Sequence, residues 1–204
     1  MGLFLKDIIL KGKTALVTGA TKGIGRGTAI ALAQAGANII AIGRNQTELD
    51  SLKKIIKKLK VKYYPFNCNV NDFELMKNYI SKIKKLDILV NNAGTNIPEP
   101  FLSVKKSSLE TILNVNTKAV FNVAQLCANQ IIKLNRKGGS IINISSIFGT
   151  ISKEKRAIYS ATKFGIHGLT VGCSNDLARF NILVNTVSPG FVLTDLTKIN
   201  LSKG

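Results

Sequence analysis

Residues 14–25 read Thr-Ala-Leu-Val-Thr-Gly-Ala-Thr-Lys-Gly-Ile-Gly. An apolar run of the strand type leads directly into a glycine-rich loop, and a helical pattern follows it. Glycine lets the backbone turn tightly and lets a phosphate approach a helix N-terminus, where free N–H groups and the helix dipole favour anions. The stretch therefore predicts a strand–loop–helix unit that holds the pyrophosphate of a dinucleotide.

Strand and helix patterns alternate along the rest of the chain. Strands are expected at 14–18, 38–42, 61–68, 86–90, 140–144 and 182–187. Helices are expected at 23–35, at 47–58 from a Thr47 N-cap, from the capping-box spacing of 71–74 to about residue 85, and around 107–134 and 157–179. Apolar strands joined by helices are typical of a parallel sheet covered on both faces. The expected fold is α/β, a single-domain Rossmann-type doubly wound parallel sheet of six strands within residues 1–204.

The strongly basic composition does not by itself predict a nucleic-acid partner. The 204 residues carry 29 Lys and Arg against 11 Asp and Glu, for a net charge of +18. The lysines are dispersed, and their densest stretch, at 53–60, has the spacing of a solvated amphipathic helix. A nucleic-acid surface more often clusters Arg with aromatic residues, so that role is the least favoured alternative.

Two further classes are disfavoured by pattern. No apolar run approaches the roughly 20 residues of a membrane-spanning helix, and residues 1–6 lack a signal-peptide pattern, so a cytoplasmic protein without membrane contact is expected. Cys68, Cys127 and Cys173 lie far apart, and His167 is the only histidine. No metal site or disulfide is therefore expected; the cysteines are predicted to be buried apolar residues, and His167 a surface or packing residue.

Further motifs follow the glycine-rich loop in a fixed order. They are Asn91-Asn92-Ala93-Gly94 after the fourth strand, Ser146 placed 13 residues before Tyr159, a Tyr-x-x-x-Lys formed by Tyr159 and Lys163, and Pro189-Gly190 with Thr194 after the sixth strand. Together with the TGxxxGxG spacing of the loop, this set resembles the short-chain dehydrogenase/reductase family from about Lys11 onward. The resemblance implies an oxidoreductase that transfers a hydride between a nicotinamide cofactor and a carbonyl or alcohol carbon.

The resemblance also implies a set of cofactor-binding positions. They are Gly19, Thr21, Lys22, Gly23, Ile24, Gly25, Arg44, Asn69, Val70, Asn92, Ala93, Gly94, Tyr159, Lys163, Pro189, Gly190, Val192 and Thr194. NAD binders usually carry an acidic residue after the second strand, whereas this chain has Arg44 there. Arg44 and Lys22 can clamp a 2′-phosphate, although both can also be ordinary surface cations. NADP(H) is therefore expected as the preferred cofactor, with NAD(H) possible.

One position departs from the family pattern. Asn69 stands before Val70, where family members usually carry an Asp that contacts the adenine. An amide can still accept a hydrogen bond through its carbonyl, but it can also flip. A weaker adenine contact is expected here.

The resemblance implies a catalytic tetrad of Asn116, Ser146, Tyr159 and Lys163. Reference tyrosine has a pKa of about 10, so a cation must stabilise its phenolate. Lys163, one helical turn after Tyr159, is expected to lower the Tyr159 pKa together with the oxidised nicotinamide. Ser146 would hydrogen-bond the substrate oxygen, with Ser145 as the adjacent alternative. Asn116 would hold a water that links Lys163 to solvent, with Asn114 as the alternative.

The substrate side is less determined. Residues 95–101 leave the fourth strand at its carboxyl end and are expected to shape it. Candidate substrates are small carbonyl or alcohol compounds, including a 3-oxoacyl thioester on acyl carrier protein or a sugar-type ketone, and a homo-oligomer is expected. Family members extend further than Lys203-Gly204, so the usual seventh strand and a lid are expected to be absent, exposing the sixth strand. An inactive nucleotide-binding protein therefore stays an alternative.

Overall fold

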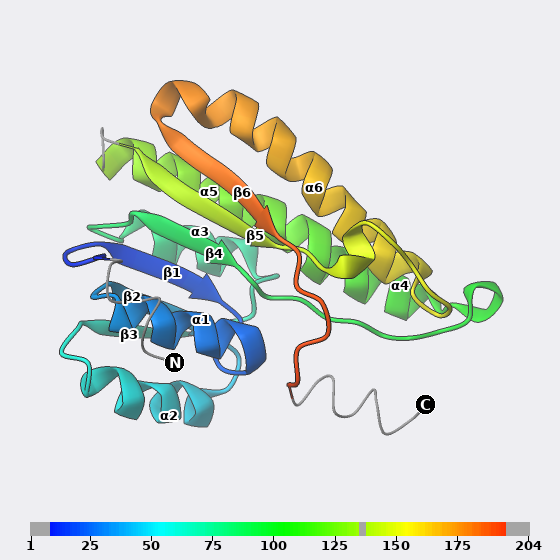
Figure 1. The fold of residues 1–204 in the computed structure, drawn as a ribbon, viewed down its shortest axis with the longest axis horizontal. Helices are drawn as coiled ribbons and strands as arrows, with labels where there is room; N and C mark the ends of the chain where they lie inside the picture. The colour runs from blue at the N-terminus through cyan, green and yellow to red at the C-terminus, as the bar shows by residue number, and fades with distance from the viewer. Residues whose placement is uncertain (1–8, 135–137, 195–204) are drawn as a thin grey trace.

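The computed structural model describes residues 9–134 and 138–194. Their strands form one six-stranded sheet in the order β3-β2-β1-β4-β5-β6, in which every neighbouring pair is parallel (Figure 1). The strands are β1 (Thr14–Thr18), β2 (Asn38–Gly43), β3 (Tyr63–Asn67), β4 (Ile88–Asn91), β5 (Gly139–Ile144) and β6 (Ile182–Val187). The expected fold class is confirmed; residues 1–6 and Lys203-Gly204 lie outside the described part of the chain.

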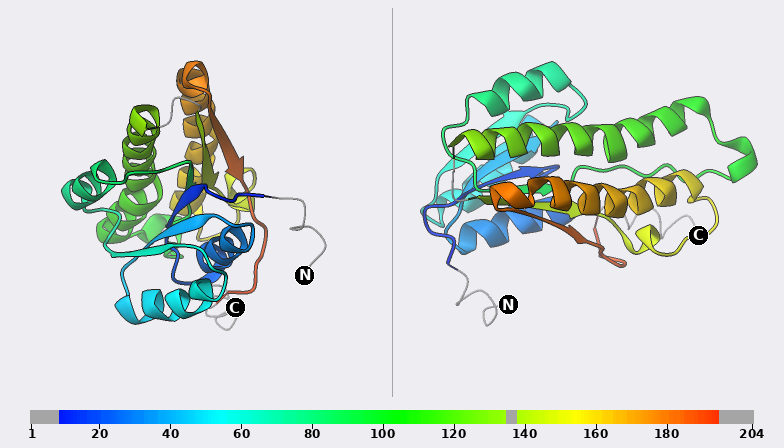
Figure 2. Two further views of the ribbon diagram at one scale, coloured as in Figure 1. Left: turned by 90° about the vertical axis from the view of Figure 1, so that its left-hand side faces the viewer. Right: turned by 90° about the horizontal axis from the view of Figure 1, so that it is seen from above.

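Helices cover both faces of the sheet. They are α1 (Gly23–Gln34), α2 (Gln46–Lys57), α3 (Phe73–Ser81), α4 (Lys106–Leu113), α5 (Ala119–Leu134) and α6 (Ala157–Leu177). Shorter turns are η1 (Phe101–Ser103), η2 (Asn114–Lys118), η3 (Ile147–Gly149) and η4 (Ala178–Phe180). The blue and cyan α1 and α2 lie on one side of the sheet, and α3, α5 and α6 lie on the other (Figure 2). No helix in 9–134 or 138–194 has both the length and the apolar character needed to span a bilayer.

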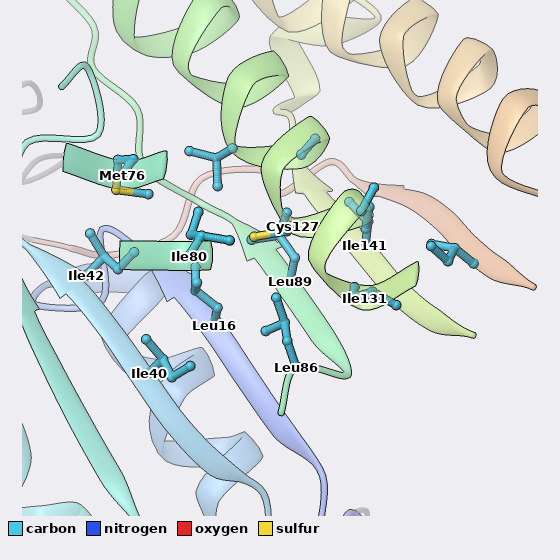
Figure 3. Close-up of a cluster of buried hydrophobic side chains, with 14 of the residues drawn as sticks. Leu16, Ile40, Ile42, Met76, Ile80, Leu86, Leu89, Cys127, Ile131 and Ile141 are labelled. Atoms are coloured by element: carbon cyan, nitrogen blue, oxygen red, sulfur yellow. The ribbon is translucent and has the colours of Figure 1, made fainter. Parts of the chain in front are cut away.

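Alternation along the strands supplies both hydrophobic cores. In β1, Leu16 faces the α3 and α5 side, whereas Ala15 and Val17 face α1 and α2, as the two-residue period of a strand requires. Figure 3 shows Met76 and Ile80 from α3 meeting strand residues beneath α5. Burying one such side chain stabilises the fold by about 1.5–3 kcal/mol. The two cores thus fix the helices against the sheet and so fix the positions of the strand ends.

Coverage on both faces holds for the central strands only. All five residues of β1 are buried, but β6 alternates, with Leu183 64% and Val187 49% exposed. The strands β3 and β6 lie at the two edges of the described sheet. This agrees with the expected exposure of the sixth strand, whereas the expectation of a sheet covered on both faces holds for the central strands.

Two helix starts were predicted at the wrong residue. The N-cap of α2 is Asn45, whose Oδ1 accepts from the Glu48 N–H at 3.1 Å, and not Thr47. The N-cap of α3 is Asp72, whose Oδ1 accepts from the Leu75 N–H at 3.1 Å. In both helices the capping side chain belongs to the residue three positions before the N–H that donates to it, which is the usual spacing of an N-cap hydrogen bond.

The predicted end of α3 near Lys85 was also wrong, since α3 ends at Ser81. Gln130 of α5 donates from Nε2 to the Ser81 carbonyl at 3.3 Å and to the Ile83 carbonyl at 2.7 Å. A residue some 50 positions away therefore satisfies carbonyls that would otherwise need a further helical turn.

The expected helix at 107–134 is divided by the π turn η2, at whose end the Ala119 N–H donates to the Asn114 carbonyl, five residues back. Cys68 and Cys127 are buried as predicted, but Cys173 is half-buried on α6, so its predicted burial was wrong.

Candidate active site

A pocket of about 560 Å³ lies where the carboxyl ends of the strands meet. Its wall is built largely from the loops that follow the six strands β1 to β6, together with the start of α6. The predicted residues that line it are Gly19, Thr21, Lys22, Gly23, Ile24, Arg44, Asn69, Val70, Asn92, Ala93, Gly94, Ser146, Tyr159, Lys163, Pro189, Gly190, Val192 and Thr194. The predicted residues Gly25 and Asn116 do not line the pocket.

The glycine-rich loop needs its glycines for two different reasons. Gly19 and Gly23 have φ values of +62° and +50°, in the left-handed region that side chains disfavour. At Gly25 an added Cβ would collide with the Gly19 carbonyl oxygen and with Asn92 Nδ2. The loop is therefore closely packed at Gly25 and leaves its outer surface open to the pocket.

Thr18 and Asn92 join this loop to the one that follows β4. Thr18 Oγ1 accepts from the N–H groups of Asn92 and Ala93, each at 3.0 Å. In return, Asn92 Nδ2 donates to the carbonyls of Thr18 at 3.0 Å and Gly19 at 3.2 Å. The Asn92 side chain thus supports the glycine-rich loop.

Lys22 and Arg44 both line the pocket but differ in their surroundings. Lys22 Nζ lies 2.7 Å from Glu48 Oε1, an ion pair that the sequence reasoning missed. Arg44 is exposed, and no carboxylate in the described ranges lies within 4.0 Å of it. Glu48 offsets the charge of Lys22, so Arg44 is the cation better placed to attract a further anion.

Asn69 is exposed on the pocket wall. Its Oδ1 accepts from the Asn71 N–H at 3.2 Å. The side-chain carbonyl is thereby directed to the local turn, which leaves the amide group as its outward-facing polar group.

Lys163 is the most deeply buried cation of the pocket, with 5% of its surface exposed. Its Nζ donates to the Ile144 carbonyl at 2.8 Å and lies 5.7 Å from the centre of the Tyr159 ring. Burial lowers the pKa of Lys163 to about 8, because a low-dielectric environment disfavours the charged form. Gly94 lies opposite, where even a Cβ would approach Nζ to 3.7 Å.

Tyr159 and Ser146 meet on the same wall. Burial raises the pKa of Tyr159, while the hydrogen bond with the Ser146 side chain and the charge of Arg156 oppose that rise. Lys163 Nζ lies 5.7 Å from the centre of the Tyr159 ring. Its expected lowering of the Tyr159 pKa, together with the oxidised nicotinamide, stays a prediction.

Ser145 and Ser146 point in different directions. Ser145 is buried, and its Oγ donates to the Lys163 carbonyl at 2.8 Å. Ser146 Oγ accepts from the Phe148 N–H at 3.2 Å and lies close enough to the Tyr159 side chain to oppose the rise in its pKa. Of the two adjacent candidates, Ser146 is therefore the one that faces the phenol.

Asn116 is fully buried in the π turn and does not reach the pocket wall. Its Oδ1 accepts from the Thr95 N–H and its Nδ2 donates to the Thr95 carbonyl, both at 2.8 Å. Nδ2 also donates to Thr162 Oγ1 at 3.2 Å. The Asn116 side chain thus joins the segment after β4 to α6, whereas the alternative, Asn114, is exposed.

The segment after β6 returns to the pocket as expected from its position. The Val187 carbonyl accepts from the Ser145 N–H at 2.8 Å, and the Pro189 carbonyl accepts from the Ile147 N–H at 2.9 Å. Phe148 packs edge-on against both Tyr159 and Phe191, with ring centres 6.2 and 6.1 Å apart. These contacts place Pro189-Gly190 beside the phenol.

A buried polar chain behind the site was missed by the sequence reasoning. Asn91 Nδ2 donates to Asn143 Oδ1 at 3.2 Å, and Asn143 Nδ2 donates to Thr170 Oγ1 at 3.1 Å. Thr186 Oγ1 then donates to Thr170 Oγ1 at 2.7 Å. The chain ties β4, β5 and β6 to α6, and its signal in the sequence is polar residues within otherwise apolar strands.

Two charged residues of the pocket wall, Lys153 and Arg156, were missed, whereas Asn96 belongs to the segment 95–101 that was expected to shape the substrate side. The Oδ1 of Asn96 is buried, and no donor in the described part of the chain pairs with it. No group of three His, Cys, Asp or Glu side chains suited to a metal ion occurs within the described residues.

Comparison with known proteins connects this geometry to others. Residues 13–203 match the family model of the short chain dehydrogenases. The chain is 38% identical to a 3-oxoacyl-(acyl-carrier-protein) reductase of Thermotoga maritima over 93% of its own length and 78% of the relative's. It is 36% identical to L-xylulose reductase of Mus musculus, with 96% of this chain and 78% of the relative covered.

Solved structures agree on the fold. Carveol dehydrogenase of Mycobacterium avium, in complex with NAD, superposes with a TM-score of 0.83 at 28% identity, covering 88% of this chain and 71% of that one. A protein of Agrobacterium tumefaciens assigned as a 2-deoxy-D-gluconate 3-dehydrogenase, with bound NADP, gives 0.89 at 29% identity, covering 97% and 78%. The pocket therefore lies on a scaffold that in other proteins holds either dinucleotide.

Proposed function

This chain belongs to the short-chain dehydrogenase/reductase family, and we propose that it transfers a hydride between NADP(H) and a carbonyl or alcohol carbon, with Tyr159 as the acid–base residue. Its class, an oxidoreductase acting on a CH–OH or C=O group, follows from the family and from its reductase and dehydrogenase relatives. The cofactor preference and the residue roles are the proposal. The observation that carries it is the convergence of Tyr159, Ser146 and Lys163 on one pocket wall opposite the glycine-rich loop.

The residues present fit a dinucleotide. Gly19 and Gly23 leave backbone exposed at the start of α1, where free N–H groups attract a pyrophosphate. Lys22, Arg44 and Lys163 line the pocket wall, which carries no Asp or Glu, and this charge suits a polyanionic ligand. When bound, the nicotinamide supplies or accepts the hydride.

The proton chemistry falls to this chain's own side chains. In reduction, Tyr159 donates its phenol proton to the substrate oxygen, and in oxidation it accepts that proton. Ser146, which pairs with the phenol, orients the same oxygen. Lys163 would hold the ribose hydroxyls of the bound cofactor, and it supplies positive charge on the helix face of Tyr159. Asn116 acts as a positioning residue, since its side chain is committed to Thr95 and Thr162.

A preference for NADP(H) is supported by Arg44. Arg44 follows β2, where NAD binders usually present an acid to the ribose 2′-OH, and it lines the pocket with no carboxylate within 4.0 Å in the described ranges. A guanidinium binds a phosphate through two parallel hydrogen bonds. Lys22 contributes less, because Glu48 already pairs with it.

The substrate is proposed to be a 3-oxoacyl thioester, free or on an acyl carrier protein, or a sugar-type ketone, the classes named for the relatives. One dinucleotide-binding domain is proposed on the basis of the single sheet and the family match over 13–203. A cytoplasmic location and a homo-oligomer stay predictions.

Oxidation of NADPH, followed by absorbance with a panel of 3-oxoacyl thioesters and ketoses, tests the function. We expect turnover with NADPH to exceed turnover with NADH. Binding of NADPH without oxidation by any carbonyl would instead favour the alternative, a nucleotide-binding protein without turnover.

A further inference from the structure

The pocket carries cations at two separate places. Lys22 and Arg44 follow β1 and β2, whereas Lys153 and Arg156 belong to the segment between η3 and α6, next to Tyr159. Figure 1 shows this second segment in yellow, at the carboxyl end of β5. The proposed cofactor role uses the first pair and Lys163. It gives no task to Lys153 and Arg156, although both line the wall on which the reacting carbonyl must lie.

Hydrogen bonds join the segment that carries Lys153 and Arg156 to η3 and to α6. The N–H groups of Thr150 and Ile151 donate to the Ile147 carbonyl at 3.0 and 3.1 Å. Ser152 Oγ and Ser160 Oγ lie 2.7 Å apart, which joins the middle of the segment to α6. Lys153 directly follows Ser152, so its backbone is held close to the first turns of α6.

Arg156 is the better placed of the two. It is half-buried at the N-cap of α6, three residues before Tyr159, and so lies on the same side of the helix. Its Nη1 donates to the Lys155 carbonyl at 3.3 Å, and no carboxylate of the described chain lies within 4.0 Å. Its charge reaches the phenol, because it opposes the rise that burial causes in the Tyr159 pKa.

A guanidinium with free N–H groups binds carboxylates and phosphates in a fixed, two-pronged geometry, and a neighbouring ammonium adds charge. No Asp or Glu of the pocket wall competes for either cation. A neutral ketone would leave both cations without a partner beside the reacting carbonyl. A substrate with an anionic group would pair them.

We propose that Arg156 and Lys153 bind an anionic group of the carbonyl substrate, so that the enzyme selects ketones bearing a carboxylate or a phosphate over their neutral counterparts. This inference rests on the proposed reductase function. It names Arg156 as a specificity-determining residue.

Two matched substrate pairs test it with NADPH as the reductant. Dihydroxyacetone and dihydroxyacetone phosphate differ by one phosphate, and L-sorbose and 5-keto-D-gluconate differ by a carboxylate in place of a hydroxymethyl group. For the wild type we expect kcat/KM to favour the anionic member of at least one pair by about 10- to 100-fold, the scale of a charged hydrogen bond. The pair that shows the preference identifies whether the anion is a phosphate or a carboxylate.

Variants assign that preference to residues. Arg156→Gln is expected to remove most of the ratio between anionic and neutral substrate, mainly through KM, and Lys153→Gln to reduce it less. The ratio is the useful readout because any change in the Tyr159 pKa affects both members of a pair. Lys155→Gln is the matched control, since Lys155 lies in the same segment but not on the pocket wall, and it should keep the ratio.

Equal kcat/KM for both members of both pairs would overturn this inference and leave the reductase function standing. A preference that persists in Arg156→Gln and Lys153→Gln would overturn it as well. Absence of NADPH oxidation with these four compounds and with the panel of 3-oxoacyl thioesters and ketoses would overturn the proposed function, and the inference would fall with it.

Discussion

Tyr159 lies between opposing influences at the scale of a single residue. Burial raises its pKa, and Ser146 and Arg156 oppose that rise, so the phenol stays protonated near neutral pH and can act as an acid toward a carbonyl oxygen. Lys163, one turn along α6, is itself buried and has a pKa lowered to about 8. The site thus combines a tyrosine whose pKa burial raises with a lysine whose pKa burial lowers.

Replacing Tyr159 with Phe removes the phenol proton while keeping the ring that packs against Phe148. We expect carbonyl reduction to fall by at least about 100-fold, the scale of one acid–base group, with the Kd for NADPH unchanged. Steady-state kinetics and fluorescence titration measure the two quantities. Tyr79→Phe is the matched control, since Tyr79 stacks on Phe66 between β3 and α3, away from the pocket, and should keep full activity. Retained turnover in Tyr159→Phe would refute the assigned role.

Replacing Lys163 with Met is expected to abolish turnover but to stabilise the fold at pH 7. Between pH 8 and 10.5 the unfolded chain holds a proton on Lys163 that the folded chain has released, so the wild type gains stability as pH rises through this window. Below pH 8 the buried charge costs the wild type on the order of 1–3 kcal/mol, allowing for the lost hydrogen bond to Ile144.

Urea unfolding at pH 7 and pH 10 measures this difference. The gain in the free energy of unfolding for Lys163→Met should be present at pH 7 and nearly gone at pH 10. Lys54→Met, on the exposed face of α2, serves as the control and should show no such pH dependence. A Met variant less stable than the wild type at pH 7 would contradict the argument.

Arg44 carries the proposed cofactor preference. Arg44→Asp is expected to weaken NADPH binding by about 10- to 100-fold, because it removes charge-assisted hydrogen bonds to the 2′-phosphate and adds repulsion. NADH binding should be kept or improved. Lys22→Met should weaken NADPH binding less, since Glu48 already pairs with Lys22. Fluorescence titration with NADPH and NADH measures these affinities. Equal affinities of the wild type for the two nucleotides would contradict the proposed preference.

At the scale of elements, the site depends on how helices and strands end. The π turn η2 buries Asn116 against Thr95, and the cap of η3 directs Ser146 toward Tyr159. The polar chain from Asn91 through Asn143 to Thr170 holds β4 and β5 against α6, the helix that carries Tyr159 and Lys163. Each of these contacts fixes the end of a helix or strand, and that end in turn positions a side chain of the pocket.

The N-cap of α3 tests whether the end of a helix depends on one side chain. Asp72→Ala should lower the free energy of unfolding by about 1 kcal/mol, because the Leu75 N–H loses its partner. Asn71→Ala is the matched control and should leave stability nearly unchanged, since Asn71 contributes only its backbone N–H, to Asn69 Oδ1. Urea titrations of the two variants compare them, and equal losses would show that Asp72 is not the cap.

At the scale of the whole described molecule, two cores hold a sheet whose pocket edge gathers residues 19 to 194. Cys127 lies within the larger core (Figure 3), where burial raises the pKa of its thiol. Cys173 is half-buried and packs against the same core, so Cys127 and Cys173 report on different depths of the fold.

Thiol labelling can follow this order. Cys173 is expected to react with a thiol reagent in the native protein, whereas Cys127 should react only as fast as the whole domain unfolds. Labelling rates in increasing urea, resolved by mass spectrometry, measure both. Cys127 labelling that does not depend on urea would indicate a local opening between α5 and the sheet.

Much of this molecule can be predicted from the order of its residues, because the signals are local. The glycine-rich loop after β1 and the alternation of strands and helices follow from short-range periodicity, and they were sufficient to predict the doubly wound sheet. The site residues, Ser146, Tyr159 and Lys163 among them, were implied by motifs that resemble the short-chain dehydrogenase/reductase family, and all of them except Gly25 and Asn116 line the pocket wall.

Only the tertiary structure decided what each side chain contacts. It paired Lys22 with Glu48, supplied Gln130 as the donor to the carbonyls at the end of α3, committed Asn116 to Thr95, and placed Arg156 close enough to Tyr159 to oppose the rise in its pKa. These contacts depend on burial and on direction in space, and most join residues far apart in the sequence. Periodicity along the chain carries no information about them, because hydrogen bonds and Coulomb interactions act through distances that exist only after the elements have packed.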